Sequence, residues 1–436
     1  MTLILADWLV MAGDVEPRER SGVRVVDGVI GDVGSNVELR WAYPNDLIVE
    51  GDGSILLPGF VNSHVHMYGV LAHGITPAET PSGFWSFLED FWWPQVEDVL
   101  DHDMIAVATD WVCAEMLRSG TTTFYDILEA PNALPGALLV EKEVVERRGI
   151  RGVLSFEGTE RGGLEIAEQG LAENVRLIEA SADSDLVSGM MCFHTTFTCS
   201  AAYIHRAFEL GAEHNVLTHA HCNEGVHEGM WCEDNVGMRT LEYYDDIGVA
   251  GPGFLASQCV QLSDREREIL VETGMRVAHM PLANCEVGGG IAPIPELLDA
   301  GVPVGLGSDG YVNDFFEVMR GAFLLHKARL LDPGVMPAST VLAMATEGGA
   351  RAVGLAGIGR LDVGFSADLQ LVDAVFPTPL TSENLREQLV LWRNHAHVRD
   401  VMVAGQWRVR GGEVLDADLD LMRARVHEQA GRLWSA

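Results

Sequence analysis

Basic residues are scarce in this chain of 436 residues. Lys and Arg together number 29, against 64 Asp and Glu, so the formal net charge at pH 7 is -35. Such a charge repels phosphate groups, which argues against nucleic acids and anionic membranes as partners. The acidic excess instead predicts a well-hydrated protein surface.

Two other features are missing from the chain. No run of 18 apolar residues occurs, and residues 1–13 are apolar but contain Asp7 and lack a basic start. We therefore expect neither a membrane-spanning helix nor a signal peptide. The seven cysteines are odd in number and form no Cys-x-x-Cys pair, which predicts free thiols and a cytoplasmic location.

The pattern of apolar residues changes near Gly59. Before it, short apolar runs and the Asp-Gly pairs at 27–28 and 52–53 predict strands joined by hairpins. After it, apolar runs alternate with amphipathic helical segments, which predicts a (β/α)8 TIM-type barrel, with a doubly wound open sheet as the alternative. The candidate barrel strands are 59–66, 121–127, 151–156, 190–194, 217–221, 254–258, 276–279 and 303–309.

Short strands return near the end of the chain, at 369–372, 398–403 and 406–410. We infer that both chain ends combine into a small β-sandwich beside the barrel. The predicted organisation is therefore residues 1–57 for the first part of the sandwich, 58–357 for the barrel, and 358–436 for the second part of the sandwich with a terminal helix near 419–433.

Histidines mark the end of the first candidate strand. His64 and His66 stand two residues apart at the end of an apolar run that follows Pro58-Gly59. Side chains alternate along a strand, so both imidazoles face one side, at the strand end where a parallel barrel carries its chemistry. This pattern suits a metal ion, and a pair of hydrogen-bonded core histidines is the alternative.

Two later strands also end in polar residues. In the fifth, His221 ends the strand and Glu224 follows three residues later; in the eighth, Asp309 lies in a glycine-rich loop. A carboxylate so placed reaches substrate or water without binding the metal tightly. Each motif alone has an ordinary reading as a buried strand end or a turn. Together, three imidazoles and one carboxylate match a zinc-type set with one position open for water.

These motifs, with several others, follow one another in the order of a known family. The additional motifs are Ser-Gly-Thr-Thr-Thr-Phe-Tyr-Asp at 119–126, Ala-His-Met-Pro through Asn at 278–284, and Gly-Ile-Ala-Pro-Ile-Pro at 290–295. The chain resembles the amidohydrolase superfamily, in its branch of aminohydrolases and chlorohydrolases acting on purines, pyrimidines, pterins and s-triazines. This branch includes the ATZ/TRZ and the cytosine/guanine deaminase-like enzymes.

The resemblance implies a site. It implies that one divalent metal ion, Zn2+ with Fe2+ as the alternative, is bound by His64, His66, His221 and Asp309. It further implies that Glu224 moves protons, that His194 contacts the substrate, and that the chain forms a homo-oligomer, a dimer or larger.

Two departures from the family pattern concern the substrate. The sixth strand ends in Gln258 where such enzymes usually have a histidine. An amide donates and accepts hydrogen bonds but does not take up a proton, so catalysis depends more on Glu224 and Asp309, or the substrate differs. The adenosine-type deaminases also carry a ribose-binding glutamate two residues after a proline. Here Val96 holds that position and Glu97 follows, which argues against a nucleoside such as S-adenosylhomocysteine.

Other residues have two readings. His279 and Gln258 are candidate substrate contacts, and Trp85 and Trp92 are candidates for an aromatic lid that stacks on a flat heterocycle. Core packing is the alternative for His279 and for the aromatic residues. His219 is expected to pack near His221. The remaining histidines are interpreted as surface or packing residues: His73, His102, His205, His214, His227, His326, His395, His397 and His427.

The predicted activity is hydrolytic deamination of an amino-substituted N-heterocycle. A metal-activated hydroxide attacks a ring carbon, Asp309 accepts the water proton, Glu224 protonates the ring and the leaving group, and ammonia departs. One alternative is hydrolysis of a cyclic amide or urea, or of a C–Cl or alkylamino substituent. Its binuclear form needs a bridging lysine, and the chain has only Lys142 and Lys327. The other alternative is a catalytically silent barrel that serves as a binding module.

Overall fold

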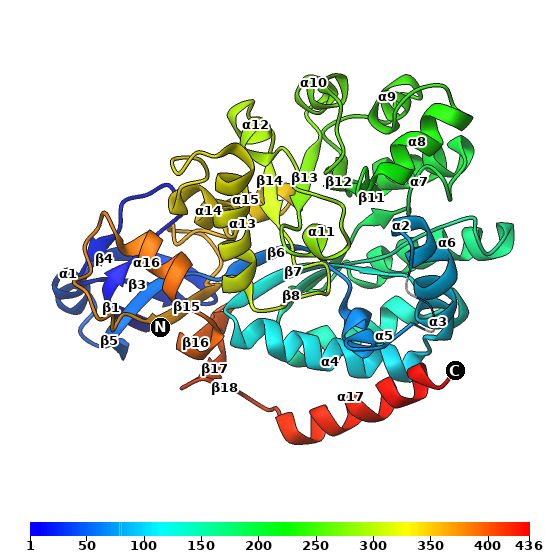
Figure 1. Ribbon diagram of the computed structural model, residues 1–436. Coiled ribbons are helices and arrows are strands. Elements are labelled where there is room, and N and C mark those ends of the chain that lie inside the picture. The colour runs from blue at the N-terminus through cyan, green and yellow to red at the C-terminus, as the bar shows by residue number, and fades with distance from the viewer. Residues whose placement is uncertain (78, 80) are drawn as a thin grey trace.

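Eight parallel strands follow one another in chain order in the computed structural model, which describes residues 1–77, 79 and 81–436 (Figure 1). The strands are β6 (Phe60–Val65), β7 (Thr121–Leu128), β8 (Arg151–Phe156), β9 (Val187–Gly189) with β10 (Met191–Cys192), β11 (Thr218–Cys222), β12 (Phe254–Gln258), β13 (Arg276–His279) and β14 (Val304–Leu306). Their order runs with the sequence and never reverses, unlike that of a doubly wound sheet.

Two junctions join these strands into a barrel. β9 and β10 are separated only by Met190, whose N–H donates to Leu154 while the next N–H donates to Leu217. At the other junction, the backbone N–H groups of Ser308 and Asp309 both donate to the carbonyl of His64, at 3.0 Å. The end of β14 therefore lies beside the end of β6, and the predicted TIM-type barrel is confirmed.

The barrel strands are almost continuously apolar because they are buried on both faces. All eight residues of β7 and all five of β12 are buried, since helices cover the outside and side chains fill the centre. The outer helices are α4 (His102–Arg118), α5 (Ala137–Arg148), α6 (Leu164–Ala180), α7 (Ala201–His214), α8 (Val226–Asn235), α9 (Thr240–Asp246), α10 (Asp264–Thr273), α12 (Ile294–Asp299), α13 (Phe315–Leu330), α14 (Ala338–Met344) and α15 (Glu347–Ala352).

Strands from both chain ends form a second sheet of nine strands. Its members are β1 (Thr2–Leu9), β2 (Arg18–Glu19), β3 (Ser21–Val26), β4 (Val29–Ser35), β5 (Leu47–Pro58), β15 (Leu369–Asp373), β16 (Val398–Val403), β17 (Gln406–Arg410) and β18 (Glu413–Val414). β15 pairs antiparallel with β5, which joins the two ends as the sequence predicted. The domain boundaries after residues 57 and 357 stay predictions.

Helices also accompany the terminal sheet. They are α1 (Asn36–Ala42), α16 (Leu385–Trp392), the short turn η5 (His395–His397) and α17 (Leu419–Trp434). Figure 1 shows α17, in red, running along α4 on the outside of the barrel. Within the described residues, none of the helices combines the length and apolarity that a membrane crossing needs.

A long connection between β6 and α4 lies over the carboxyl ends of the barrel strands. It contains η1 (Met67–Ala72), α2 (Phe84–Phe87), the π-helical turn η2 (Leu88–Trp92), α3 (Trp93–Gln95) and η3 (Glu97–Val99). Two more short elements follow other strands, η4 (Pro131–Ala133) and α11 (Ala283–Glu286). Together these segments enclose the space above the strand ends.

Candidate metal and catalytic site

A cavity of about 300 Å³ opens at the carboxyl ends of the barrel strands. Its floor is polar and comes from the strand ends: His66, Glu157, His194, His221, Glu224 and Asp309. Its walls are largely apolar and come mainly from the connection between β6 and α4: Ala72, Ile75, Phe84, Phe87, Leu88, Phe91, Trp92 and Trp93. A cavity of this size and character is typical of a small-molecule site.

Four donor groups converge at the floor. The Nε2 atoms of His64 and His66 are 3.3 Å apart, and the same distance separates the Nε2 atoms of His66 and His221. Oδ1 of Asp309 lies 2.8 Å from Nε2 of His64. One ligand atom from each of these four residues lies within 4.8 Å of all the others.

The geometry of this cluster fits a shared cation better than a set of mutual hydrogen bonds. Three imidazole nitrogens that face one another cannot all be satisfied, because each contact needs one donor and one acceptor. Oδ1 of Asp309 is buried and has no hydrogen bond of suitable geometry. Burial lowers the pKa of His64 to about 4, which keeps this imidazole neutral. Three imidazoles and one carboxylate are a donor set of the zinc type.

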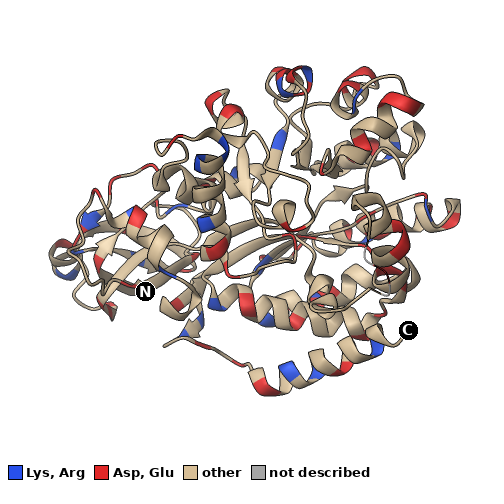
Figure 2. Ribbon diagram, in the orientation of Figure 1, with Lys and Arg blue, Asp and Glu red and all other residues tan. Residues whose placement is uncertain are grey.

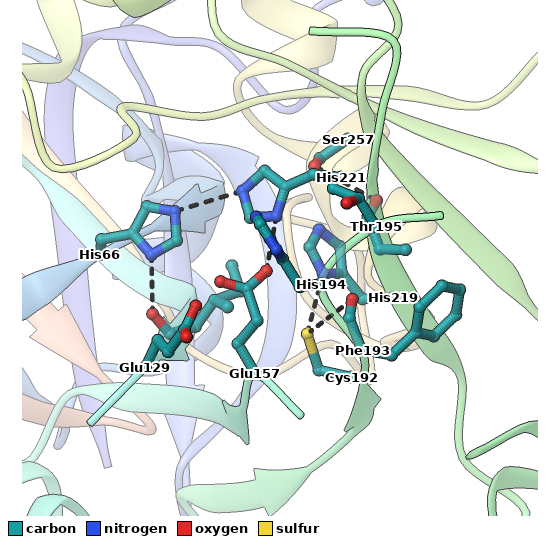
Figure 3. A network of polar contacts seen from close by, with 12 residues as sticks. His66, Glu129, Glu157, Cys192, Phe193, His194, Thr195, His219, His221 and Ser257 are labelled. Carbon is teal, nitrogen blue, oxygen red and sulfur yellow. Dashed lines mark hydrogen bonds and ion pairs between the residues drawn. The ribbon is translucent and has the colours of Figure 1, made fainter. Parts of the chain in front are cut away.

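Other groups orient the histidines. Nδ1 of His221 lies 2.6 Å from Oε1 of Glu157, and Nδ1 of His66 lies 2.8 Å from the carbonyl oxygen of Ile127. Figure 3 shows His66 and His221 facing each other with Glu157 against the far side of His221. Because each Nδ1–H donates away from the cluster, Nε2 is the atom of each ring that would bind a cation at the shared centre.

The carboxyl groups of Glu224 and Asp309 differ in protonation. Burial and the nearby charge of Asp309 raise the pKa of Glu224 to about 8, so this carboxyl carries a proton at neutral pH. Burial acts in the same direction on Asp309, but the adjacent imidazoles of His64 and His66 outweigh it and hold the pKa of Asp309 well below its usual range. Two carboxyl groups with opposite protonation are suited to an acid and a base role.

Gln258 reaches the cluster through Asp309. Its Nε2 lies 3.3 Å from Oδ2 of Asp309, and its Oε1 accepts a hydrogen bond from Nδ2 of Asn284. The Gln258 side chain is fully buried, and its backbone has a φ of 68°, in the left-handed region that non-glycine residues seldom adopt. The amide orientation is therefore fixed, with the donor group directed at Asp309.

The predicted substrate contacts divide into two groups. His194 and Trp92 line the cavity. Trp85 does not, because its ring stacks on His227 with a centroid distance of 4.5 Å and meets the edge of Trp93. The expectation that Trp85 stacks on the substrate is therefore corrected to a packing role.

His279 requires the same correction. Its ring is 1% exposed, and its Nε2 lies 3.1 Å from Nε2 of His326 on α13, away from the cavity lining. The core-packing alternative accounts for this residue, because a strand end in a barrel also borders the surrounding helices. His219 packs as expected, with Nδ1 3.2 Å from Sγ of Cys192.

Three cavity residues escaped the sequence interpretation. Glu157 directly follows strand β8, the same signal that marked His66 and Asp309, and its importance went unrecognised. His73 was expected to be a surface or packing residue, yet it lines the cavity and its Nε2 lies 2.7 Å from the carbonyl oxygen of Gly310. Glu97 lies one residue later than the ribose-binding glutamate of the adenosine-type deaminases. It is nevertheless part of the cavity lining and is 3% exposed.

Comparisons with known proteins agree with this architecture. Residues 55–408 match the model of the Amidohydrolase family. A 5-methylthioadenosine/S-adenosylhomocysteine deaminase of Syntrophobacter fumaroxidans is 33% identical over 97% of this chain and 96% of its own length. A 5'-deoxyadenosine deaminase of Methanothermobacter thermautotrophicus is 33% identical over 91% of this chain and 90% of its own length.

Solved structures are similar in the same way. The crystal structure of an adenosine deaminase from Xanthomonas campestris with bound zinc superposes with a TM-score of 0.90, at 26% identity, over 100% of this chain and 99% of that one. Atrazine chlorohydrolase from Arthrobacter aurescens, complexed with zinc, has a TM-score of 0.85 at 22% identity, over 99% and 100%, and shares the fold. The chain therefore belongs to the Amidohydrolase family, as its motifs predicted, and is a hydrolase of carbon–nitrogen bonds.

Proposed function

We propose that this chain is a metal-dependent hydrolytic deaminase of adenine-type nucleosides, which replaces the ring amino group by a carbonyl and releases ammonia. The observation that carries the proposal is the convergence of His64, His66, His221 and Asp309 at the floor of a cavity that Glu224 also lines. Relatives that are about one-third identical over nearly the whole chain are named as deaminases of such nucleosides.

The four donor residues would hold one divalent cation, and zinc is the candidate because both similar crystal structures contain it. When bound, such a cation lowers the pKa of water to about 7 and polarises the atom that is attacked. Fe2+ suits the same donors and is the alternative.

Asp309 and Glu224 divide the proton transfers. Asp309 is ionised and accepts one proton of the attacking water, while protonated Glu224 gives its proton to the ring nitrogen beside the reacting carbon. The adduct then carries a hydroxyl and an amino group on one carbon. The hydroxyl proton returns to Glu224, Asp309 gives its proton to the amino group, and ammonia leaves. Both carboxyls end in their starting states.

The remaining lining supports a purine base and its sugar. Phe87 and Trp92 are stacked on each other with ring centroids 5.5 Å apart, and both line the cavity. Aromatic faces of this kind favour contact with a flat base. Glu97 is held by the hydroxyl of Tyr68 at 2.9 Å and offers a carboxyl group to sugar hydroxyls. His194 is part of the floor, and we assign it to contact the base.

The test is an ammonia-release assay on the zinc-loaded protein. We expect turnover of adenosine, 5'-deoxyadenosine or 5'-methylthioadenosine, and much slower turnover of guanine, cytosine, pterins and aminotriazines. Glu224→Gln keeps the size of the side chain but removes the transferable proton, so kcat is expected to fall by roughly 10² to 10⁴-fold with the metal retained. Release of chloride from a chlorotriazine without ammonia from any nucleoside would instead support the dechlorinating alternative.

The metal content and the ammonia assay together also test the alternative of a catalytically silent barrel. A protein with about one equivalent of metal but no turnover on any of these compounds would favour the catalytically silent reading. A homo-oligomer and a cytoplasmic location stay predictions, and light scattering on the metal-loaded protein tests the first of them.

A further inference from the structure

The cavity lining changes character between its floor and its mouth. Floor residues such as Glu157, His194 and His221 are buried, whereas two other lining residues, Glu286 and Tyr311, are exposed, and we call this exposed part of the lining the mouth. If the amino-bearing ring lies at the floor, the 5' end of a nucleoside extends toward this mouth. The mouth therefore contacts the part of the substrate in which the related nucleosides differ.

Positive charge is almost absent around this mouth. Among the residues that the structure describes, no lysine or arginine lines the cavity. The sequence extends this statement to the connections between each barrel strand and its following helix, which contain a single basic residue, Arg161. These connections are residues 66–101, 129–136, 157–163, 193–200, 223–225, 259–263, 280–293 and 307–314.

Arg161 is not available to a ligand. Its Nε lies 2.5 Å from Glu129, its Nη1 lies 2.9 Å from Asp98, and its Nη2 lies 3.2 Å from Glu97. The guanidinium also lies over the ring of Trp93, 5.0 Å from the centroid. All three nitrogens are already bound to carboxylates, so the one basic group of this face is neutralised within the protein.

Acidic and apolar side chains occupy the mouth instead. Glu286 is exposed, and the apolar residues Ile75, Phe84, Phe87 and Val287, which are partly exposed, also line the cavity. Figure 2 shows that Lys and Arg, in blue, lie mostly on the outer helices and the terminal strands. An anionic group at the mouth would lose water and find no cation, whereas an apolar group would gain contact area.

We propose that this cavity selects adenine-type nucleosides with an uncharged, apolar 5' substituent and rejects those that carry a phosphate or a carboxylate there. The inference rests on the proposed function and narrows its substrate class. It separates two compounds that appear together in the name of one relative, because 5'-methylthioadenosine is uncharged and S-adenosylhomocysteine bears a carboxylate.

The test compares substrates of the same shape and different charge. With the zinc-loaded full chain, we expect kcat/KM for adenosine 5'-carboxamide to exceed that for adenosine 5'-carboxylic acid at least tenfold, roughly the effect of one unpaired charge in a partly desolvated site. Adenosine 5'-monophosphate is expected to fall roughly 100-fold or more below 5'-methylthioadenosine, with S-adenosylhomocysteine between them.

A pair of variants assigns the effect to charge at the mouth. Val287→Arg adds a cation to the wall and is expected to raise the acid-to-amide ratio of kcat/KM at least fivefold, whereas Val287→Gln adds a polar side chain without charge and leaves that ratio within twofold. Because both kcat/KM values of a ratio are measured on the same variant, the ratio does not depend on the fraction of that variant that is folded and active.

The outcomes separate this inference from the proposed function. Equal turnover of acid and amide by the wild-type chain would overturn the charge selection and leave the deaminase proposal intact. Absence of ammonia release from every nucleoside, the carboxamide included, would overturn both. An unchanged ratio in Val287→Arg would also count against a charge-selective mouth.

Discussion

Two groups of histidines are buried in this barrel, and their surroundings differ. His64, His66 and His221 meet at the strand ends with Asp309, and Glu157 holds His221 from behind. His279 and His326 contact each other between β13 and α13, and in the described part of the chain neither ring bonds to a carboxylate. The His66 side chain is 12% exposed, but the other rings of both groups are buried, so burial alone does not distinguish the ligand set from the packing pair.

Charge makes the difference. Burial lowers the pKa of His326 to about 4 and that of His279 well below its usual range, so both rings stay neutral. Burial acts in the same direction on His221, but the carboxylate of Glu157 outweighs it and raises the pKa of His221 to about 9. His64 also stays neutral, but Asp309 lies beside it, so every ring of the first group has a carboxylate close by that favours a bound cation. The second pair has no such carboxylate and fills space in the core.

The backbone differs as well. Asn223, Gln258 and Asp309 follow or end the strands that border the metal cluster, and all three have φ between 52° and 68°. His279 and His326 lie in a regular strand and helix. Left-handed non-glycine residues cost energy and persist where the surroundings fix them. Here they direct an amide and a carboxylate toward the cluster.

The largest effect is expected when one histidine of the first group is replaced. His66→Ala is expected to abolish stable metal binding and to lower kcat/KM by roughly 10³-fold or more, because the remaining donors do not complete the set. Metal analysis after gel filtration, with the ammonia assay, measures both effects. His326→Gln serves as the matched control and should retain its metal. Equal metal content in the two variants would contradict the distinction between the groups.

Removing the compensating carboxylate gives a smaller effect. Glu157→Ala takes away the acceptor for Nδ1–H of His221 and is expected to lower metal affinity by about 10 to 100-fold. Glu157→Gln keeps an acceptor oxygen and should recover part of the loss. Competition with a chelator of known affinity measures this difference. An affinity for the metal that does not change in Glu157→Ala would mean that His221 needs no orienting partner.

The side-chain amide of Gln258 is expected to contribute less to kcat/KM than the metal ligands do. Gln258→Met has a similar shape but removes the donor to Asp309 and the acceptor for Asn284. A hydrogen bond to a charged group contributes about 1.5 to 3 kcal/mol, so kcat/KM should fall by roughly 10 to 100-fold while metal content remains near that of the wild type. A change in KM alone would instead show that Gln258 acts on substrate binding.

The packing pair should affect stability rather than catalysis. His326 has a pKa of about 4 in the folded protein against an ordinary value of 6.5. Between these two pH values the unfolded chain binds a proton that the folded chain does not bind. The free energy of unfolding therefore decreases as the pH falls from about 6.5 toward 4. The full loss from this group is roughly 3 kcal/mol.

Urea unfolding at a series of pH values tests this expectation. His326→Gln keeps a donor for His279 but does not titrate, so its stability should depend less on pH across that window. Its turnover at neutral pH should stay within twofold of the wild type. A loss of metal or of activity in this variant would place His279 and His326 with the first group after all.

The sequence was a good guide to strands and a partial guide to the site. Apolar runs separated by amphipathic windows located all eight barrel strands, because burial on both faces demands such runs. The fourth strand begins earlier than predicted, since Val187 already pairs with Gly152. Strand-end position identified His64, His66, His221 and Asp309 as candidates for one cluster, because parallel strands bring their carboxyl ends to one face.

Strand-end position did not separate residues that point into the cavity from those that point elsewhere. His279 ends β13 and His221 lies one residue before the end of β11, yet His221 lines the cavity whereas His279 contacts His326 on α13. Aromatic residues of the β6–α4 connection are close in sequence, but their short helical turns direct Trp85 and Trp92 to different neighbours. Glu97 enters the cavity from η3, where no periodic pattern predicts the direction of a side chain.

By itself the sequence determined the barrel, its family and the kinds of atoms available for chemistry, since periodicity and residue type are local properties. Only the tertiary structure decided which histidines have a carboxylate beside them, which residues line the cavity, and that the guanidinium of Arg161 is bound within the protein by three carboxylates. These properties depend on distances between residues that are far apart in the chain. Such distances follow from tertiary packing and not from the order of residues in the sequence.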